Sequence, residues 1–416
     1  MTELPLEGLR IISLSQVYAG PYAGKLLADM GAEVIKIESA VRSGRGGRQP
    51  QPGAVYPDGQ PGETPYNRSA YYNELNRNKY AVGLDLSREQ GREIFKKLVA
   101  ISDVVLENFS PRVMANFGLD YPTLRQIKPE IIMVSISAYG QTGPYRDYVS
   151  FGRGIEAMSG LSQVTGYEDS QPLGPGIAYA DATAGLHAAF ATLVALRHRR
   201  RTGKGQHIDL SLRESLIPLL GEHLLDYSMN RRSPQRRGNR DSSAMFQGCY
   251  RCRGDDAWIA IAICDDGEWR AFCSALGNPP WTTEERFATS SRRQQNQRDL
   301  DRNIERWTTG HQPDEAMCIL QQAGIRAGAV RSADELTRDP HLWERGFFEM
   351  VTHPEAGTHA HPGISWKLSR TPGRIRMPAP CFAEHNDYVF GGLLGMSQEE
   401  LAKLAEEGVI ATVPLR

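Results

Sequence analysis

With 416 residues, the chain is long for a single domain and suits two. Hydrophobic residues make up 40% of it and charged residues 23%, which are ordinary proportions for a soluble globular protein. The net charge of −1 gives no electrostatic basis for binding nucleic acid or an anionic membrane. Any anionic ligand must therefore be met by local basic residues.

Neither a secretory signal nor a membrane span is predicted. Met1–Pro5 has no basic region and no apolar run follows it. The longest apolar stretch, Ala189–Leu196, is far too short to cross a bilayer. The six cysteines lie in the second half, which suits a reducing compartment, so we expect a cytoplasmic protein. Cys249 and Cys252 have CxxC spacing, but no second pair or spaced histidines follow, so we predict a strand there and no metal site.

The first part of the chain alternates strand-like and helix-like segments. Tyr22–Met30 has helical spacing and is stopped by Gly31, and a second helix over 87–101 opens with a capping box of Ser87 and Gln90. Five β-branched runs read as strands: Leu9–Leu14, Ala32–Ile37, Ala81–Leu86, Asp103–Leu106 and Ile131–Ile136. This alternation predicts an α/β fold with a doubly wound, Rossmann-like parallel sheet.

The remaining segments predict a second, smaller domain. Arg42–Tyr71 reads as a long loop, Ala184–Arg197 as a buried helix and Ser211–Met229 as another helix. A strand pair follows Gly248, and Asp265 opens a helix. We therefore expect a large domain over 1–225, a linker over 226–244, a small α+β domain over 245–345, and a return segment over 346–416 that completes the large domain.

The predicted sheet places five strand ends along one edge. Ligands of doubly wound sheets bind beyond the carboxyl ends of the strands. These ends are Gln16–Gly20, Glu38–Ala40, Leu84–Ser87, Glu107–Ser110 and Ser137–Gly140. Gly152–Ala157 matches the dinucleotide-binding pattern G-x-G-x-x-A, but it follows no good strand. The serine-hydrolase pattern G-x-S-x-G does not occur in the sequence. A dinucleotide-binding protein and a serine hydrolase are thus disfavoured.

Asp181 stands at the start of a helix-like segment rich in small residues, Ile177–Phe190. Taken alone, such an Asp is most simply an N-cap. Together with Arg201–Ser211 and Gly31–Glu38, however, this segment resembles the class III coenzyme A transferases, the family of formyl-CoA and carnitine CoA-transferases. The resemblance runs from about residue 6 to about residue 386 and implies that Asp181 is the nucleophile.

The resemblance also implies that CoA binds at the strand-end edge, as substrate and product and not as a tightly bound cofactor. The residues that match its CoA contacts, or lie beside them, are Val17, Tyr18, Ala19, Ser39, Arg42, Leu84, Asp85, Ser87, Asn108, Phe109, Arg112, Ser137 and Tyr139. The chain departs from better-known members at three positions: Ser39 and Ser137 replace basic residues, and Asn116 replaces an arginine. Arg42, Arg45, Arg77, Lys79 or Arg112 could supply the missing charge.

The implied reaction moves CoA from an acyl-CoA, such as succinyl-CoA, to a free carboxylic acid. Asp181 attacks the thioester to give a mixed anhydride, and the CoA thiolate then forms an aspartyl-CoA thioester. The segment Pro65–Lys79 is similar to transferases that act on succinate-type or aromatic acids. Family members form interlocked dimers, so a homodimer is expected, with a heteromer as the alternative.

Two other functions stay open. An α-methylacyl-CoA racemase shares the fold but needs a histidine ahead of the Asp, and Phe151–Glu156 has none. A CoA-binding partner subunit of a heteromer would not need Asp181. His187, nearly two turns beyond Asp181, is predicted to be a packed helix-face histidine.

Overall fold

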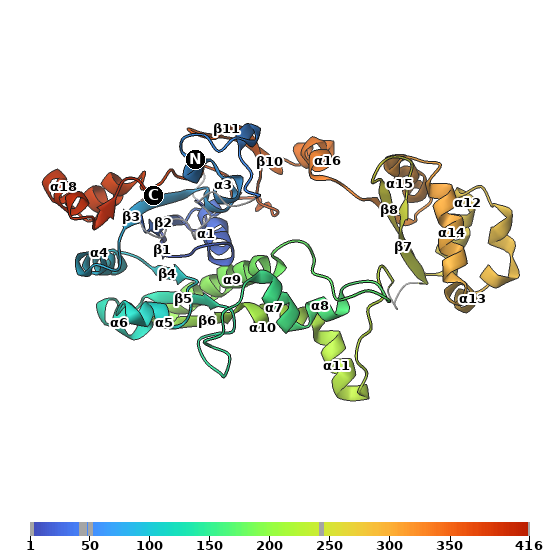
Figure 1. The fold of residues 1–416 in the computed structure, drawn as a ribbon, viewed down its shortest axis with the longest axis horizontal. Coiled ribbons are helices and arrows are strands. Elements are labelled where there is room, and N and C mark those ends of the chain that lie inside the picture. Colours follow the sequence, from blue (N-terminus) through green and yellow to red (C-terminus); the bar gives the residue numbers. More distant parts are fainter. Residues whose placement is uncertain (1–3, 41–47, 49–52, 241–244, 415–416) are drawn as a thin grey trace. The chain divides into compact units, whose positions relative to one another are not determined.

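The computed structural model describes residues 4–40, 48, 53–240 and 245–414. This part of the chain divides into two compact units (Figure 1). The first comprises residues 1–162, 174–232 and 340–416, and the second comprises residues 163–173 and 233–339. Among the described residues, no helix is both long and apolar enough to cross a membrane.

The first unit is built on a seven-stranded sheet in the order β12-β3-β2-β1-β4-β5-β6. Its strands are β1 Arg10–Ser13, β2 Glu33–Glu38, β3 Lys79–Leu84, β4 Val104–Glu107, β5 Ile132–Ser137, β6 His207–Ser211 and β12 Ile410–Ala411. All pairings are parallel except that of β12 with β3. The predicted parallel sheet is confirmed, and its strand order reverses between β1 and β4, which makes this the switch point.

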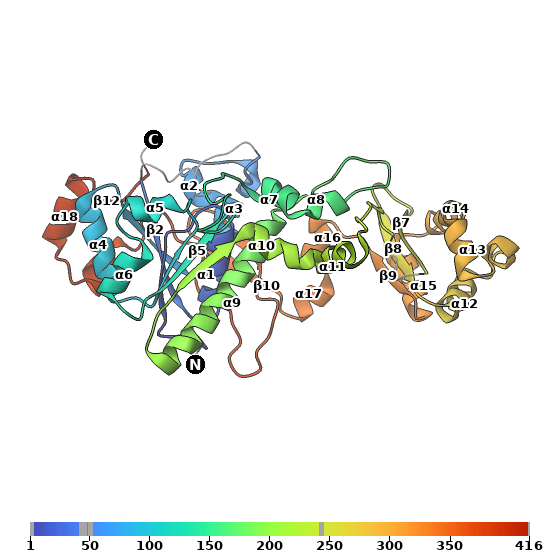
Figure 2. The ribbon, with the colours of Figure 1, turned by 90° about the horizontal axis from the view of Figure 1, so that it is seen from below.

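The helices of the first unit lie on both faces of the sheet and beyond it. They are α1 Ala19–Asp29, α2 Pro65–Arg68, α3 Ala70–Asn76, α4 Glu89–Ala100, α5 Arg112–Asn116, α6 Tyr121–Ile127, α7 Gly152–Ser159, α9 Tyr179–Thr202, α10 Leu212–Leu216, α11 Gly221–Asn230, α17 Pro340–Glu344 and α18 Gln398–Glu406, with α8 Leu161–Val164 at the boundary of the units. Strand residues alternate between two cores, because successive side chains point to opposite faces. Ile11 belongs to the core that includes residues of α1 and α9, whereas Ile12 belongs to the core that includes residues of α4, α6 and α18. Figures 1 and 2 show where these helices lie.

The second unit contains a three-stranded antiparallel sheet, β7 Phe246–Arg251, β8 Trp258–Ile263 and β9 Arg326–Ala329. Its helices are α12 Asp266–Ala275, α13 Ser290–Gln295, α14 Gln297–Thr308, α15 Pro313–Gln322 and α16 Ala333–Arg338. The predicted helix start at Asp265 is confirmed, since its carboxylate accepts the backbone N–H of Glu268 at 2.8 Å. After residue 339 the chain returns to the first unit, where β10 Phe348–His353 and β11 Gly357–Pro362 form a hairpin.

Several local predictions are wrong. Ser87 is not a helix cap: its hydroxyl donates to Asp85 Oδ1 at 2.7 Å, and α4 begins two residues later. The described part of the predicted loop 42–71 contains α2 and the start of α3. The helix predicted over 211–229 is interrupted by a 3₁₀ turn at Ile217–Leu220. Finally, α9 is buried on one face only, because Leu186 and Phe190 are exposed.

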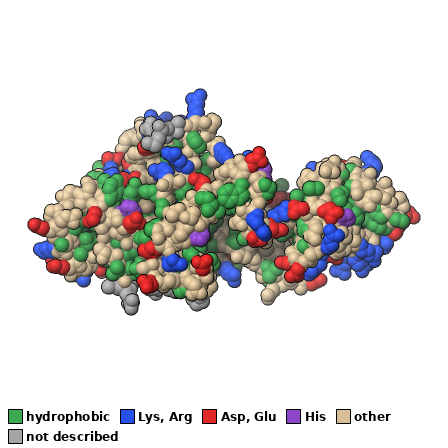
Figure 3. Space-filling view, turned by 90° about the horizontal axis from the view of Figure 1, so that it is seen from above, with side chains coloured by type: hydrophobic (Ala, Val, Ile, Leu, Met, Phe, Trp, Pro, Cys, Tyr) green, Lys and Arg blue, Asp and Glu red, His purple; other side chains and the backbone are tan. Residues whose placement is uncertain are grey.

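The surface fits the composition. On the face shown in Figure 3, acidic and basic side chains are interspersed over both units. This distribution accords with the net charge of −1 and leaves the recognition of an anionic ligand to individual residues near its site.

Candidate active site

The switch point is shaped by Asn108, the residue after β4. Its amide Oδ1 accepts the backbone N–H of Gln16 at 2.7 Å, and its Nδ2 donates to the Gln16 carbonyl at 2.7 Å. This double hydrogen bond joins the loop after β1 to the loop after β4. It holds Val17 at a φ of 61°, a conformation that a β-branched residue rarely adopts. The strain is located where α1 begins, directly at the ligand edge of the sheet.

A seam of small residues brings α9 against α1. Ala19 and Ala23 of α1 and Ala184 and Ala188 of α9 are buried in one core. A Cβ at Gly185 would lie 2.8 Å from the Ala19 carbonyl oxygen and 2.8 Å from Tyr22 Cδ1. Only glycine therefore permits this separation between the helices. The seam positions the first turn of α9 beside the N-terminus of α1.

Asp181 lies in that first turn, half-buried, and it is not the N-cap, which is Ala178. Burial raises the pKa of the Asp181 carboxyl to about 6, although the backbone N–H of Ala19 donates to the carboxylate and opposes the shift. The charge of Glu156 raises this pKa further. The carboxylate thus faces the N-terminus of α1 and is only partly solvated, an arrangement that favours reaction over structural capping.

Helix α7 provides the other wall of the site. A Cβ at Gly152 would lie 3.0 Å from Asp181 Oδ2 and 3.6 Å from the Cβ of Ala178. Glu156, which is 1% exposed, accepts the backbone N–H of Tyr179 on Oε1 at 3.0 Å. Tyr179 is the first residue of α9, so its N–H has no partner within the helix, and it is shared between the Glu156 carboxylate and the Ile177 carbonyl.

Two phenols lie near the Asp181 carboxylate. The rings of Tyr18 and Tyr71 lie 6.1 Å apart between centroids. Burial raises the pKa of both phenols, and the charge of Asp181 raises each further. Both hydroxyls therefore stay protonated at neutral pH and are available as hydrogen-bond donors at the mouth of the site.

The predicted CoA edge has an unpaired donor at its β5 end. Ser137 Oγ is buried and has no hydrogen-bond partner among the described residues. Tyr139 follows it and packs edge-on against Tyr145 and Tyr148, with ring centroids 6.0 Å and 6.2 Å away. A buried hydroxyl without a partner is costly unless a ligand or water pairs with it, so this end of the edge is suited to a polar ligand group.

At the β3 end the structure offers mainly backbone and turn groups. The Leu84 side chain is 1% exposed, while Asp85 and Ser87 form a turn in which Asp85 Oδ1 accepts the Ser87 N–H at 2.9 Å. Phe109 is half-buried beside the core, and its backbone N–H donates to Glu107 Oε2 at 2.7 Å. Strands are about 5 Å apart, so a ligand that reaches from β4 to β3 must span roughly 15 Å.

Two of the five candidate phosphate ligands are excluded. Arg77 is 1% exposed and pairs with Asp29 at 2.8 Å. Lys79 is equally buried, and its ammonium donates to the carbonyls of Pro21 and Leu75, each at 2.8 Å. Both cations belong to the core and cannot reach a phosphate without breaking these contacts.

The remaining residues proposed for the phosphate site differ in their exposure. Arg112 is exposed at the start of α5, directly after the β4 edge. Ser39 is half-buried at the end of β2. Arg42 and Arg45 lie outside the described residues. Among the described cations proposed for this role, Arg112 is therefore the one that is free to meet a phosphate at the edge.

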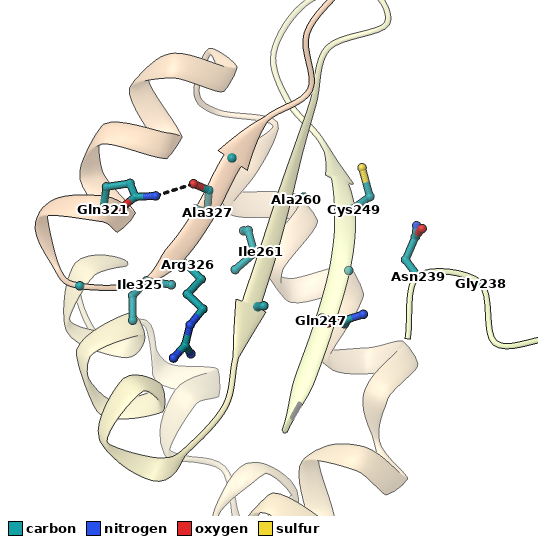
Figure 4. A pocket seen from close by; sticks show the side chains of 14 residues that line it. Gly238, Asn239, Gln247, Cys249, Ala260, Ile261, Gln321, Ile325, Arg326 and Ala327 are labelled. Atoms are coloured by element: carbon teal, nitrogen blue, oxygen red, sulfur yellow. Dashed lines mark hydrogen bonds between the residues drawn. The ribbon is translucent and has the colours of Figure 1, made fainter. Parts of the chain in front are cut away.

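A cavity in the second unit is lined mostly by small and apolar residues. It has a volume of about 760 Å³ and lies on one face of the β7-β8-β9 sheet, where the small residue Ala262 stands between Gln247 and Arg326 in the strand register. Figure 4 labels Gln247 and Arg326 among the residues that line it. Burial raises the pKa of the Cys249 thiol at its wall, so the thiolate is disfavoured. Among the described residues, no group of three His, Cys, Asp or Glu side chains could hold a metal.

Glu156, Gly152 and Tyr71 were missed by the sequence analysis. Gly152 and Glu156 lie within the G-x-G-x-x-A motif, and α7 follows a loop and not a strand. The signal in the sequence was Gly152, because this position lies against Asp181 and leaves little room for a side chain. Nothing in the local pattern indicates that Glu156 points inward, since its partner Tyr179 is distant in sequence. His187 is exposed and not packed.

These features define an α/β protein with a ligand site at the switch point of a doubly wound sheet and a half-buried carboxylate at that site. Residues 6–386 match the family model for CoA-transferase family III. The chain belongs to this family and is an enzyme, a class III CoA-transferase.

Individual relatives agree with this membership over nearly the whole length. The chain is 34% identical to the succinyl-CoA–D-citramalate CoA-transferase of Chloroflexus aurantiacus over 98% of each chain. It is 34% identical to the succinate–glutarate CoA-transferase of Agrobacterium fabrum over 94% of this chain and 96% of the relative. A crystal structure of a CAIB/BAIF family protein from Brucella suis superposes with a TM-score of 0.85 at 31% identity, covering 94% of this chain and 100% of that one.

Proposed function

We propose that the enzyme transfers CoA from succinyl-CoA to a dicarboxylic acid through covalent intermediates on Asp181. The observation that supports this most directly is the placement of Asp181: a half-buried carboxylate with a pKa of about 6, facing the backbone N–H of Ala19 at the switch point. At neutral pH it is ionised and can act as nucleophile, while its partial desolvation removes water that would otherwise compete.

The reaction exchanges one activated acyl bond for another. Asp181 attacks the thioester carbonyl, the C–S bond breaks, and a mixed anhydride and CoA thiolate form. The thiolate attacks the Asp181 carbonyl, releasing succinate and leaving an aspartyl-CoA thioester. The acceptor carboxylate then repeats both steps in reverse order, so that the new acyl-CoA leaves and the Asp181 carboxylate is restored. No step consumes ATP, because each step forms one activated acyl bond, a thioester or an anhydride, as it breaks another.

Nearby donors suit the charges that develop. Each attack places negative charge on a carbonyl oxygen, and a preorganised N–H or O–H lowers the energy of that oxyanion. The Ala19 N–H and the protonated hydroxyls of Tyr18 and Tyr71 are the candidates in this site. Gly152 leaves space for the acyl group on the α7 side of Asp181.

The choice of substrates rests on the relatives. The names of the Chloroflexus and Agrobacterium relatives contain succinyl-CoA or succinate. The other acids in these names, D-citramalate and glutarate, are dicarboxylates. We assign succinyl-CoA as donor and a dicarboxylic acid as acceptor on this basis. An activity screen of mono- and dicarboxylic acids against succinyl-CoA and acetyl-CoA, with products identified by mass spectrometry, tests the assignment.

We place CoA along the strand-end edge, with its thiol near Asp181 and its adenosine end near Leu84–Ser87 and Asn108–Phe109. Arg112 is the described cation best exposed to meet a phosphate there. Arg112→Glu should weaken CoA binding measured by calorimetry, whereas Arg77→Lys should act mainly on stability. An unchanged dissociation constant in Arg112→Glu would count against this placement.

The nucleophile is tested by trapping. Incubation with succinyl-CoA alone should leave an adduct on the peptide that contains Asp181, which hydroxylamine cleaves and borohydride reduces. Asp181→Asn should form no adduct and transfer no CoA, but it should still bind CoA. If Asp181→Asn remains fully active, the covalent route fails. If it loses transfer yet exchanges the α-proton of a 2-methylacyl-CoA, the racemase alternative is supported.

We further propose that the enzyme is cytoplasmic and a homodimer. The proposed cytoplasmic location rests on the free cysteines of the chain. The homodimer is supported by an exposed apolar stripe on α9, formed by Leu186, Phe190, Leu193 and Val194. Contiguous apolar surface of this kind marks protein contacts. A heteromer with a related chain is the alternative.

A further inference from the structure

We infer that Glu156 is a positioning residue for the covalent step: its buried negative charge, fixed to the first turn of α9, favours the acylated state of Asp181 over the free carboxylate. The inference deepens the proposed function and rests on it. It concerns one side chain that the chemistry above does not use, and it follows from where that side chain is held.

The geometry fixes Glu156 beside the nucleophile. Its side chain is 1% exposed, so water screens its charge poorly. Oε1 accepts the Tyr179 N–H at 3.0 Å, and Tyr179 precedes Asp181 by only two residues in the same helical turn. The Ser159 hydroxyl donates to the Glu156 backbone carbonyl at 2.8 Å and closes the end of α7. Glu156 therefore contacts the turn that carries Asp181 through the Tyr179 N–H, which it shares with the Ile177 carbonyl at 2.9 Å.

The electrostatic consequence follows from charge alone. Acylation of Asp181 removes its negative charge, as protonation does. A fixed negative neighbour disfavours the ionised carboxylate and so favours both neutral forms by a similar factor. The buried charge of Glu156 thus makes formation of the anhydride and of the aspartyl-CoA thioester more favourable, while the hydrogen bond to Tyr179 keeps this charge in place.

The other ionisable groups around the Asp181 and Glu156 carboxylates are of several kinds. Tyr18 and Tyr71 lie near Asp181, in the loop after β1 and in α3, and both are protonated phenols at neutral pH. Helix α10, which packs on α7, carries Arg213 and Glu214. The Arg213 guanidinium donates to the Met158 carbonyl at 2.9 Å. Arg153 of α7 is exposed.

The test is Glu156→Gln, which keeps an acceptor for the Tyr179 N–H and removes the charge. The enzyme is incubated with succinyl-CoA and graded free succinate, quenched, and the adduct fraction measured by intact-protein mass spectrometry over pH 4.5–8. The pH midpoint of adduct formation should fall by roughly half a unit to one unit, the effect expected of one neighbouring charge. The equilibrium constant for adduct formation should fall by the matching factor, roughly three- to tenfold.

Two further variants separate charge from structure. Tyr179→Pro removes the N–H at the first helical position, where proline is tolerated, and keeps the Glu156 charge; its pH midpoint should stay near that of the wild type. Glu214→Gln removes an exposed carboxylate on the neighbouring helix and should change neither quantity. CoA affinity, measured by calorimetry, should be equal in all variants.

The outcomes distinguish the two proposals. Absence of any adduct on the wild type would overturn the covalent function itself. An adduct on the wild type, with the same pH midpoint and equilibrium constant in Glu156→Gln, would overturn the role of Glu156. A midpoint shift in Tyr179→Pro but not in Glu156→Gln would show a purely structural role and overturn it as well. If Glu156→Gln does not fold, Glu156→Asp takes its place: it should shift the midpoint in the same direction by less, and an unshifted midpoint counts against the inference.

Discussion

The Asp181 carboxyl shows how one residue links chemistry to stability. Burial raises its pKa to about 6, whereas an Asp in the unfolded chain titrates near 3.9. The folded state therefore binds the proton more tightly, and stability falls as pH rises between these two values. Above pH 6 the full cost applies, at most about 3 kcal/mol for a half-buried group. Keeping the Asp181 nucleophile ionised therefore lowers the stability of the folded state.

Asp181→Asn should accordingly raise the free energy of unfolding at pH 7.5, by about 1–3 kcal/mol, while abolishing transfer. The gain should vanish near pH 4, where the wild-type carboxyl is protonated in the folded protein. Urea unfolding followed by circular dichroism at the two pH values measures this difference. Equal stabilities at pH 7.5 would show that Asp181 is well solvated and that burial does not govern its ionisation.

Gly152→Ala tests the wall that α7 presents to Asp181. The added methyl group would lie 3.0 Å from Asp181 Oδ2, so it should occupy space that the acyl group needs. We expect at least a tenfold loss of kcat, about 1.4 kcal/mol in the transition state, with CoA affinity retained. Gly221→Ala is the matched control, since no atom lies within 4 Å of its added Cβ. A fully active Gly152→Ala would remove Gly152 from the site.

At the scale of single residues, the sequence predicts the role of a residue where a local motif indicates that role. Asp181 stands in such a motif and could be singled out. Glu156 could not, because its significance depends on the Tyr179 N–H, which only the packing of α7 on α9 brings within reach. Arg77 shows the opposite failure: an Arg near the edge in sequence proves to be paired with Asp29 in the core.

At the scale of elements, the seam between α1 and α9 places the nucleophile. Gly185→Ala would place a Cβ 2.8 Å from the Ala19 carbonyl oxygen, which forces the helices apart. We expect a loss of about 1–3 kcal/mol in stability and reduced transfer, because Asp181 would shift from the Ala19 N–H. His187→Ala, two residues away and exposed, should stay within about 0.5 kcal/mol of the wild type. Thermal unfolding and initial rates measure both effects.

The strands and α1 could be predicted because their hydrophobic periods match the packing they adopt. The start of α9 could not: small residues such as Ala178 and Ala180 carry no start signal, and its first N–H is capped by Glu156 from another helix. The capping box at Ser87 failed because Asp85, two residues before, offers the hydroxyl a nearer acceptor. Local signals thus succeed where the partner is local.

At the scale of the whole molecule, α9 has two apolar faces of different character. One face, with Ala184 and Ala188, is buried against the first unit. The other is the stripe of Leu186, Phe190 and Leu193 with Val194, exposed by 42–68%. The stripe recurs at helical spacing, so it forms one continuous surface. Under the proposed homodimer, a second copy of the chain buries this surface.

Phe190→Glu combined with Leu193→Glu should therefore convert a dimer into a monomer, because two charges would have to lose their water in the contact. Light scattering should give twice the chain mass for the wild type and a single chain mass for the double variant. Arg200→Gln, an exposed change further along α9, should leave the dimer intact. A wild type that stays a stable, active monomer on dilution would contradict the homodimer. A wild type that is monomeric and inactive, but gains activity with a related chain, would instead establish the heteromer.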